Sequence, residues 1–332
     1  MKARYLIGAA AALAARALWR EAHAYDLHDK VVLVTGGSRG LGLVLARQLL
    51  ACGARVAICA RDAAELQRAH DDLAPRGTVL ALSCDITRPG QVVDLIETVR
   101  ARLGPIDVLV NNAGVIEVGP MELMTIGDHD EAMRTHFWAP LELILAVLPD
   151  MRERKAGRIV NIASIGGKLP APHLLPYTAS KFALVGLSSG LRVELAKEGI
   201  RVTTVIPGLM RTGSTRQALF KGRHRDEHAW FAIAGSNPLT AISAERAAHR
   251  IVSALRHGDA EVVLGLQAAL AARLYGLAPS LGQDLLGLVA RVLPGPGGIG
   301  AARVRGMEST SRAAPSLFTR AGDRAAARNN EN

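Results

Sequence analysis

The chain has 332 residues, of which 49% are hydrophobic and only 21% are charged. This composition excludes a disordered or fibrous protein, because so much apolar side chain can form a large core. The formal net charge of +10 at pH 7 is spread along the chain. The one locally dense basic stretch, 216–225, lacks interleaved aromatic residues and the pattern of a recognition helix, so we expect no nucleic-acid partner.

The three cysteines are Cys52, Cys59 and Cys84. They have no short paired spacing that suits a metal site, and an odd number of cysteines does not suit a disulfide framework. We therefore expect no bound metal and a protein that works in a reducing compartment.

Short aliphatic runs alternate with longer helical patterns from Lys30 onward. Almost every residue of each run is apolar, as expected of strands that are buried on both faces of a parallel sheet. The alternation predicts an α/β fold with a single doubly wound parallel sheet of about seven strands, helices on both faces, and ligands at the carboxyl ends of the strands. The predicted strands are Val31–Val34, Arg55–Cys59, Val79–Ser83, Val108–Val110, Arg158–Ile162, Arg201–Ile206 and Glu261–Leu264. The predicted helices between them are Gly42–Cys52, Ala63–Leu73, Pro89–Leu103, Leu141–Lys155, Ser180–Glu198 and Ala244–Leu255.

Extensions flank the predicted α/β domain, residues 30–264. We expect an apolar N-terminal extension over 1–29, a helical extension over 265–297 and a flexible tail over 298–332. The uncharged run Tyr5–Ala15 would extend only about 16 Å as a helix, well short of a hydrocarbon core of about 30 Å. The expected location is therefore cytoplasmic; a helix that leans on a membrane surface and a helix packed on the domain remain alternatives for this segment.

Two further helices are predicted after the last strand, at Leu266–Leu277 and Asp284–Leu293. The second has a broad apolar face. We expect the pair to cover the domain or a partner copy; a pocket lid or a contact with a membrane surface is the alternative.

A glycine-rich turn, Thr35–Gly42, follows the first predicted strand and precedes the first helix. Glycines permit the tight turn and let backbone amides and the helix N-terminus approach a pyrophosphate. Such a turn is weak evidence alone, but its position between a strand and a helix is the one that dinucleotide binding requires. The sequence therefore predicts a dinucleotide cofactor.

The residues after the second strand bear on the choice of cofactor. An acidic side chain there would bind the ribose diol and repel a 2′-phosphate, whereas an arginine would bind the phosphate. This chain has Arg61, with Arg39 available from the glycine turn, while Asp62 suits the N-cap of the next helix. We therefore expect NADP(H) rather than NAD(H).

Tyr177 and Lys181 are one helical turn apart and so share a helix face, and Ser164 comes just past a predicted strand. A tyrosine with an ordinary pKa of about 10 is a poor base at neutral pH. An ammonium about 4 Å away supplies roughly the 4 kcal/mol needed to lower that pKa by about 3. We expect Lys181 to lower the pKa of Tyr177, Ser164 to hydrogen-bond the substrate oxygen, and Tyr177 to donate a proton to a carbonyl or remove one from an alcohol.

These motifs together resemble those of the short-chain dehydrogenase/reductase family. Thr35–Gly42 resembles its TGxxxGxG turn, Asn111–Gly114 resembles its NNAG element, and Ser164, Tyr177 and Lys181 resemble its catalytic set. The resemblance implies a Rossmann-like domain, hydride transfer at nicotinamide C4 and a homo-oligomer.

The resemblance also assigns further cofactor contacts. Asp85 and Ile86 match the pair that contacts adenine, the segment from Pro207 to Thr212 matches the one at the nicotinamide end, and Lys181 holds the nicotinamide ribose. With Arg61 added, the expected cofactor-binding residues are Thr35, Gly36, Ser38, Arg39, Gly40, Leu41, Gly42, Arg61, Asp85, Ile86, Asn112, Ala113, Gly114, Lys181, Pro207, Gly208 and Thr212.

The chain departs from the family pattern at His136, where an asparagine usually helps hold a water in the proton relay to the lysine. An imidazole can also bind water and relay protons near neutrality. We place His136 in the catalytic set on this ground, with a histidine that merely fills a helix interface as the alternative.

The segments expected to contact substrate are Ile165–Pro176 and Leu209–Ser236. They predict an apolar carbonyl or alcohol of lipid, steroid or retinoid-like shape. The competing hypothesis is a sensor or scaffold that binds NADP(H) without turnover. The candidate contact residues are Leu169, His173, Leu174, Leu175, Met210, Leu219, Phe220, Trp230 and Phe231.

Overall fold

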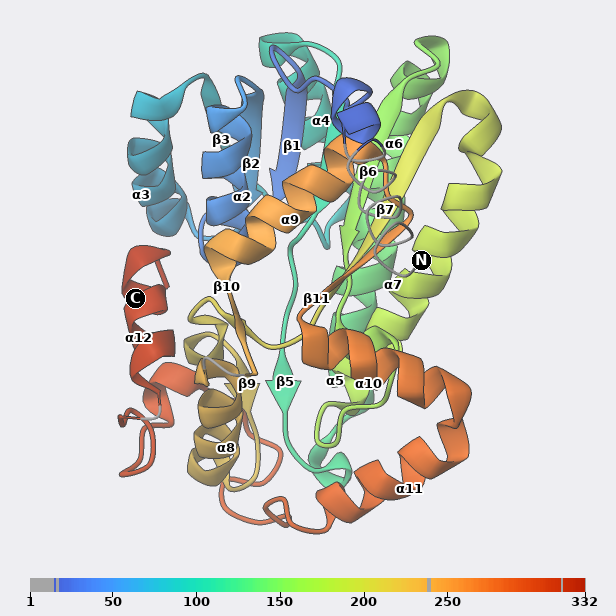
Figure 1. The fold of residues 1–332 in the computed structure, drawn as a ribbon. Coiled ribbons are helices and arrows are strands. Elements are labelled where there is room, and N and C mark those ends of the chain that lie inside the picture. The colour runs from blue at the N-terminus through green and yellow to red at the C-terminus, as the bar shows by residue number, and fades with distance from the viewer. Residues whose placement is uncertain (1–14, 16–17, 238–239, 318, 332) are drawn as a thin grey trace.

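The structure is a computed structural model that describes residues 15, 18–237, 240–317 and 319–331 (Figure 1). Its centre is a seven-stranded parallel sheet with the strand order β11-β7-β6-β4-β1-β2-β3. The predicted doubly wound parallel sheet is therefore confirmed, and every predicted run is one of its strands. The strands are β1 (Val31–Thr35), β2 (Arg55–Ala60), β3 (Val79–Ser83), β4 (Val108–Asn111), β6 (Gly157–Ile162), β7 (Ile200–Pro207) and β11 (Glu261–Leu264).

Helices cover both faces of this sheet. Helices α2, α3 and α9 pack on one face, and α4, α6 and α7 pack on the other. Their bounds are α2 (Gly40–Ala51), α3 (Ala63–Leu73), α4 (Pro89–Leu103), α6 (Ala139–Glu153), α7 (Leu175–Glu194) and α9 (Ala244–His257).

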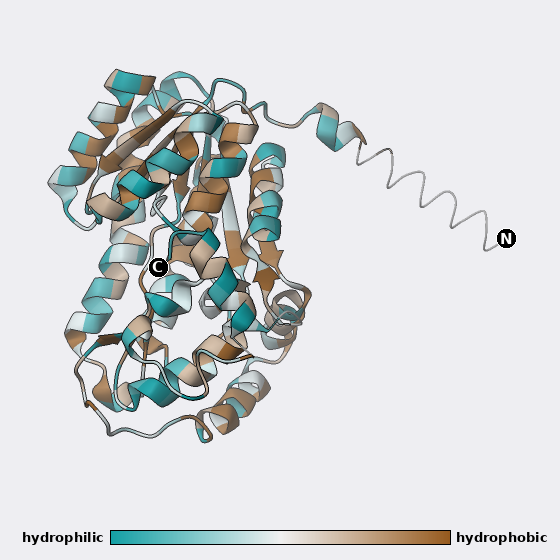
Figure 2. Ribbon diagram, turned by 90° about the vertical axis from the view of Figure 1, so that its left-hand side faces the viewer, coloured by the Kyte–Doolittle hydropathy of each residue, from teal (hydrophilic) through white to brown (hydrophobic). Residues whose placement is uncertain are grey.

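The strands are apolar throughout because successive side chains point to opposite faces of a sheet that is covered twice. In β1, Val32 and Val34 pack in the core under α2, whereas Val31 and Leu33 pack in the core on the other face. Figure 2 shows the consequence: hydrophobic strands are enclosed by helices that carry both hydrophobic and hydrophilic residues.

Helix α7 begins at Leu175, five residues earlier than the predicted Ser180. Pro176 lies in its first turn, where a proline costs no intrahelical hydrogen bond, so the residue does not delay the start of the helix. Tyr177 consequently lies in the first turn of a regular helix.

A buried ladder of polar side chains joins this helix to the centre of the sheet. The Asn111 side-chain amide donates to Asn161 Oδ1 at 2.8 Å, and the Asn161 amide donates to Ser188 Oγ at 3.0 Å. Thr204 Oγ1 donates to the same Ser188 oxygen at 2.7 Å. These bonds connect β4, β6, α7 and β7, and so they hold α7 in one register against the carboxyl half of the sheet.

A smaller layer lies beyond the carboxyl ends of the strands, in the lower half of Figure 1. It contains a three-stranded sheet in the order β12-β9-β5 and a two-stranded pair, β10 with β8. Helix α5 leads through a π-helical turn into α6. The bounds are β5 (Glu117–Val118), α5 (Ile126–Met133), the π-helical turn (Arg134–Trp138), β8 (Met210–Arg211), β9 (Leu219–Phe220), α8 (His224–Ser236), β10 (Ile242–Ser243) and β12 (Val304–Arg305).

The two helices of the C-terminal extension, α10 (Leu266–Leu277) and α11 (Pro279–Ala290), contact each other, and α10 also packs on the domain at β11, where Ala268 is buried. Many of their larger apolar side chains face outward; for example, Leu274 is 57% and Leu285 is 54% exposed. The pair thus covers little of the domain, and a partner copy, a pocket lid and a membrane surface remain predictions for the exposed side chains.

The expected flexible tail, residues 298–332, does not match the structure either. It contains β12 and helix α12 (Arg320–Arg328), and the side chains of Ala325 and Ala326 are buried. Short composition-biased segments give little sign of order on their own, because their partners lie far away in the sequence.

Residues 1–14 and 16–17 of the N-terminal extension lie outside the described residues, so the structure does not bear on most of the run Tyr5–Ala15. The part that follows contacts the domain through an ion pair between Arg20 and Asp259 at 2.8 Å. In the portion of the chain that is described, no helix combines the length and apolar character that a membrane crossing needs.

The polar ladder generates a prediction about stability. Asn161→Leu keeps the side-chain size but removes the partner of both the Asn111 amide and Ser188, and Asn161 is fully buried. We expect the free energy of unfolding to fall by about 2 kcal/mol in urea titrations. Gln67→Leu, on the exposed side of α3, is the control and should change it by less than about 0.5 kcal/mol; an equally small effect at Asn161 would contradict the role of the ladder.

Candidate active site

The glycine-rich turn has the shape that the sequence predicts. Gly36 and Gly40 have positive φ angles, +64° and +55°, which a glycine adopts without strain. A Cβ on Gly42 would overlap the carbonyl oxygen of Gly36, so α2 can start this close to β1 only with a glycine there. The absence of side chains at these glycines lets another group approach the backbone of the turn and of the first turn of α2 closely.

Hydrogen bonds tie this turn to the segment after β4. Thr35 Oγ1 accepts from the backbone amides of Asn112 and Ala113, at 3.0 and 3.1 Å. The Asn112 side chain donates to the carbonyl oxygens of Thr35 and Gly36, at 3.0 and 3.1 Å. The predicted residues Thr35, Gly36, Asn112 and Ala113 thus form one rigid unit at the carboxyl edge of the sheet.

The two arginines predicted to select NADP(H) have different surroundings. Arg39 donates to both carboxylate oxygens of Glu65, at 2.8 and 3.0 Å. Arg61 follows β2 and is exposed. The Asp62 carboxylate accepts from the Glu65 amide at 2.8 Å, which confirms Asp62 as the N-cap of α3.

The remaining predicted cofactor residues also lie at the carboxyl edge. Asp85 follows β3, where its carboxylate accepts from the amide and hydroxyl of Thr87, and Ile86 is buried. Pro207 ends β7, and the Gly208 amide donates to Leu264 O at 3.0 Å.

Thr212 lies across from the glycine turn. It is buried, and its Cβ is 4.0 Å from the position that a Cβ on Gly40 would occupy. The segment after β7 thus reaches the start of α2, although the two are far apart in the sequence.

Ser164, Tyr177 and Lys181 come together at the end of β6. Ser164 Oγ accepts from the Gly166 amide at 3.1 Å. A Cβ on Gly166 would lie 3.2 Å from the Tyr177 ring and 3.6 Å from Ser164 Oγ, so glycine keeps this approach open. Lys181 Nζ is 5.6 Å from the centre of the Tyr177 ring and donates to Ile162 O at 2.9 Å.

The protonation behaviour of this group differs from the sequence prediction. Burial raises the pKa of Tyr177, and the Ser164 hydroxyl only partly offsets this effect. Burial also lowers the pKa of Lys181 to about 7, so at neutral pH this amine carries only part of a positive charge. The expected lowering of the Tyr177 pKa by Lys181 is therefore not seen, because the lysine is itself buried.

His136 lies in the π-helical turn between α5 and α6, and its ring centre is 5.4 Å from that of Tyr177. Its Nε2 accepts from the Val115 amide at 3.1 Å, and its Nδ1 is 2.8 Å from Ser180 Oγ, whose hydroxyl donates to Tyr177 O. Burial, aided by the charge of Lys181, lowers the pKa of His136, so the ring is neutral. Both nitrogens are engaged, which favours an interface-filling residue over a water relay.

Tyr177 lines a narrow pocket with a volume of about 10 Å³, room for about one water molecule. Tyr177 is thus in contact with a cavity. The lining is mixed, since it includes three carboxylate residues as well as apolar ones. The lining residues are Val115, Glu117, Asp128, Glu131, Ala132, Pro176, Tyr177 and Leu219.

Four of the nine expected contact residues pack against one another instead. Leu174 and Phe220 are buried in a small core with Trp230 and Phe231 at its edge. Leu219 is the candidate that lines the pocket. An apolar residue in a covering segment carries the same sequence signal whether it faces a substrate or a neighbouring element.

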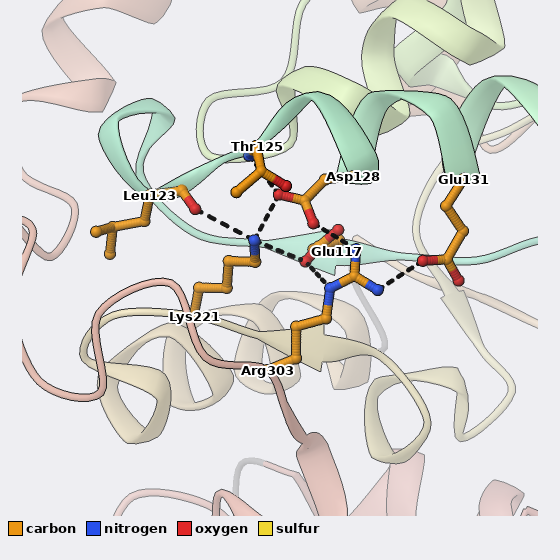
Figure 3. Close-up of polar contacts among 7 residues, drawn as sticks. All are labelled: Glu117, Leu123, Thr125, Asp128, Glu131, Lys221 and Arg303. Atoms are coloured by element: carbon orange, nitrogen blue, oxygen red, sulfur yellow. Dashed lines mark hydrogen bonds and ion pairs between the residues drawn. The ribbon is translucent and has the colours of Figure 1, made fainter.

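A cluster of buried charges, which the sequence analysis missed, lies behind this pocket (Figure 3). Lys221 is 1% exposed; its Nζ donates to Asp128 at 2.5 Å and lies 3.4 Å from Glu117. Arg303 pairs with Asp128, with Glu117 at 3.0 Å and with Glu131 at 2.6 Å. Three carboxylates thus face two cations, leaving the cluster with a net charge of −1.

Both pKa directions in the cluster follow from these contacts. Burial raises the pKa of Asp128, but the hydrogen bonds from Lys221 and Arg303 outweigh this effect and lower the pKa below its ordinary value. Burial raises the pKa of Glu117, with the charge of Arg303 opposing it. The sequence signal was absent because these residues lie on β5, on α5, directly after β9 and directly before β12, and only the fold joins them.

Removing one cation from this cluster should be costly. Lys221→Met leaves Asp128 with a single cationic partner, and we expect the free energy of unfolding to fall by about 3 kcal/mol at pH 7. Because the pair stabilises the fold above the unfolded pKa of an aspartate, the difference should shrink below about pH 4. Chemical denaturation across pH measures this, with exposed Lys197→Met as the control; a pH-independent difference would argue against the ion pair.

Comparisons with known proteins agree with this geometry. The model of the short chain dehydrogenase family matches residues 30–221. A dehydrogenase/reductase SDR family protein 7-like of Anopheles gambiae is 36% identical over 203 residues, which cover 59% of this chain and 64% of that relative. The match thus spans less than two thirds of that relative's length.

Solved structures share the fold. A short-chain dehydrogenase from Streptomyces avermitilis has a TM-score of 0.68 and 32% identity over 79% of this chain and 97% of its own. L-Sorbose reductase from Gluconobacter frateurii, solved with NADPH and L-sorbose, has a TM-score of 0.65 and 25% identity over 72% and 97% of the two chains. The family match over more than half of the sequence, the strand order and the glycine turn lead to one conclusion: the chain belongs to the short-chain dehydrogenase/reductase family of oxidoreductases.

Proposed function

We propose that the protein interconverts a carbonyl compound and an alcohol, with NADP(H) as the hydride carrier. The observation that carries this proposal is the convergence of Ser164, Tyr177 and Lys181 at the end of β6, beside a pocket and on the edge that holds the glycine turn. A Cβ on Gly114 would lie 3.9 Å from Lys181 Nζ, so the segment after β4 connects the two halves of the site.

The residues at the carboxyl edge fit a dinucleotide. The start of α2 has no side-chain cap among its described neighbours, so its backbone amides would bind a pyrophosphate. The Gly40 amide, which donates to Asn329 O at 2.8 Å, would have to change partner. The exposed guanidinium of Arg61, and that of Arg39 once it leaves Glu65, would bind a 2′-phosphate. A relative of the same fold was solved with NADPH, which supports this choice over NAD(H).

When bound, the nicotinamide supplies the hydride that reaches the carbonyl carbon. Ser164 donates a hydrogen bond to the carbonyl oxygen and orients it. Tyr177 donates its phenolic proton to the same oxygen, and Lys181 in its cationic form stabilises the phenolate that remains. A proton from solvent then restores the phenol.

The raised pKa of Tyr177, caused by its burial, suits the reductive direction. The phenol remains protonated through neutral pH, as a proton donor must, whereas alcohol oxidation needs the phenolate. We therefore propose that Tyr177 is held near neutral pH in the protonated form that carbonyl reduction requires.

We propose a neutral substrate with an apolar body. Val115, Pro176 and Leu219 offer apolar contacts beside Tyr177. The carboxylates that line the pocket carry a net charge of −1 with their cations, and they would repel an anionic compound. The homo-oligomer, the membrane-surface contact and the location remain predictions that await separate experiments.

Replacing the proton donor tests the mechanism directly. Tyr177→Phe should lower the turnover number for NADPH-dependent carbonyl reduction about 10²- to 10⁴-fold, because it removes general acid catalysis. The affinity for NADPH, measured by cofactor fluorescence, should change little. The control is Tyr275→Phe, on the surface of α10, which should retain full activity. Equal rates for Tyr177→Phe and the unaltered chain would contradict the role of Tyr177 as proton donor. If the unaltered chain binds NADPH without any turnover, the sensor hypothesis is favoured instead.

A substrate panel tests the proposed specificity. Rates of NADPH consumption should be highest with neutral apolar ketones or aldehydes, lower with neutral sugars and lowest with carbonyl compounds that carry a carboxylate. The physical reason is that the lining combines apolar side chains with carboxylates that outnumber their cationic partners. Activity confined to hydrophilic or anionic carbonyls would overturn the substrate class while leaving the catalytic assignment intact.

A further inference from the structure

Residues 329–331, which follow α12, lie directly on the glycine turn. The backbone amide of Gly40, the first residue of α2, donates to the carbonyl oxygen of Asn329 at 2.8 Å. In Figure 1, α12 lies below α3, close to the carboxyl edge of the sheet. A distant segment of the chain thus occupies the amide that a pyrophosphate would use.

Asn330 adds three hydrogen bonds around the same turn. Its side-chain amide donates to Ser38 O and to Glu65 O, both at 2.9 Å, and its Oδ1 accepts from Arg68 Nε at 2.8 Å. The residue has a φ of +57°, a conformation that asparagine tolerates better than most residues. An asparagine can make all three bonds because its side chain carries both an amide donor and a carbonyl acceptor.

Glu331 places a carboxylate where a phosphate is expected. Its side chain is 4% exposed, and its Oε1 lies 2.5 Å from the position that a Cβ on Gly40 would take. Its Oε2 lies 3.7 Å from Arg39 Nε and has no hydrogen-bond partner within the described residues. A buried carboxylate with an unpaired oxygen, aimed at a helix N-terminus, mimics a bound anion.

Burial makes the charged form of the docked carboxylate costly. It raises the pKa of Glu331 to about 7; the charge of Arg39 opposes the rise, that of Glu65 adds to it, and that of Arg216 opposes it. Keeping Glu331 ionised in the docked position therefore costs free energy at neutral pH. Helix α12 itself rests on α8 and β8, so the segment has an anchor beyond the turn.

We propose that residues 329–331 are an internal ligand of the dinucleotide site, so that the segment 320–331 and the cofactor compete for the start of α2. The proposal rests on the proposed placement of the dinucleotide at the glycine turn. Both occupants need the Gly40 amide and the space beside Thr212, so they exclude each other. Displacement of Glu331 also leaves Arg39 with one carboxylate fewer, which makes it more available to a 2′-phosphate.

The competition lowers the apparent affinity for the cofactor. When an internal segment fills a site in most molecules, the apparent dissociation constant rises by the inverse of the open fraction. A segment docked in about nine molecules of ten would thus weaken NADPH binding roughly tenfold. The apparent affinity for NADPH would increase with the fraction of molecules in which 320–331 is undocked.

Amide hydrogen exchange on the full chain tests whether NADPH displaces the segment 320–331. Saturating NADPH should increase amide exchange in 320–331 while it decreases exchange in the turn 35–42. If the turn gains protection and 320–331 keeps or gains protection as well, the two are not competitors and the proposal fails. If the turn gains none, the cofactor placement itself is contradicted and this proposal falls with it.

Substitutions in the full chain provide the second readout. Asn330→Ala combined with Glu331→Ala removes the side-chain bonds and the buried carboxylate, and should lower the dissociation constant of NADPH roughly tenfold. Ala327→Ser, on the exposed side of α12, is the control and should leave it unchanged. An unchanged or weaker NADPH affinity in the double variant, with the fold intact by circular dichroism, would overturn the proposal.

Discussion

The close approach of helix α2 to strand β1 is the constraint on which the rest of the site depends. It requires glycine at 42, because any Cβ there would overlap the Gly36 carbonyl, and it leaves the first amide of the helix pointing out of the turn. A helix N-terminus that no side chain caps attracts an anion. The proposed pyrophosphate and residues 329–331 are two alternative ligands for this helix N-terminus.

The catalytic half of the site depends on burial. The ladder from Asn111 to Ser188 holds α7 on the sheet, and α7 carries Tyr177 and Lys181 beside Ser164. The same burial keeps the phenol protonated and leaves the lysine only partly charged at neutral pH. The protonated phenol is the form that the proposed proton donor needs.

The residues after α11 link the two halves. Arg303, which directly precedes β12, pairs with carboxylates that line the pocket beside Tyr177, and residues 329–331 cover the glycine turn. Segments that the sequence analysis treated as a flexible tail thus reach both ligand positions. Any movement of this region would change the electrostatics of the pocket and the accessibility of the turn together.

The sequence by itself determined the sheet, the helices on its two faces, and the positions of Ser164, Tyr177 and Lys181 on particular elements. It could do so because periodicity and strand-end position are local properties of the chain. The family followed from the order of the same motifs.

Only the tertiary structure decided the pKa of Tyr177, the engagement of both nitrogens of His136, the charge cluster around Lys221 and the docking of Glu331. Each depends on which residues become neighbours and how much water they lose, and those neighbours lie tens to hundreds of residues apart. A side chain's charge and partners are set by the packed environment, which no local pattern records.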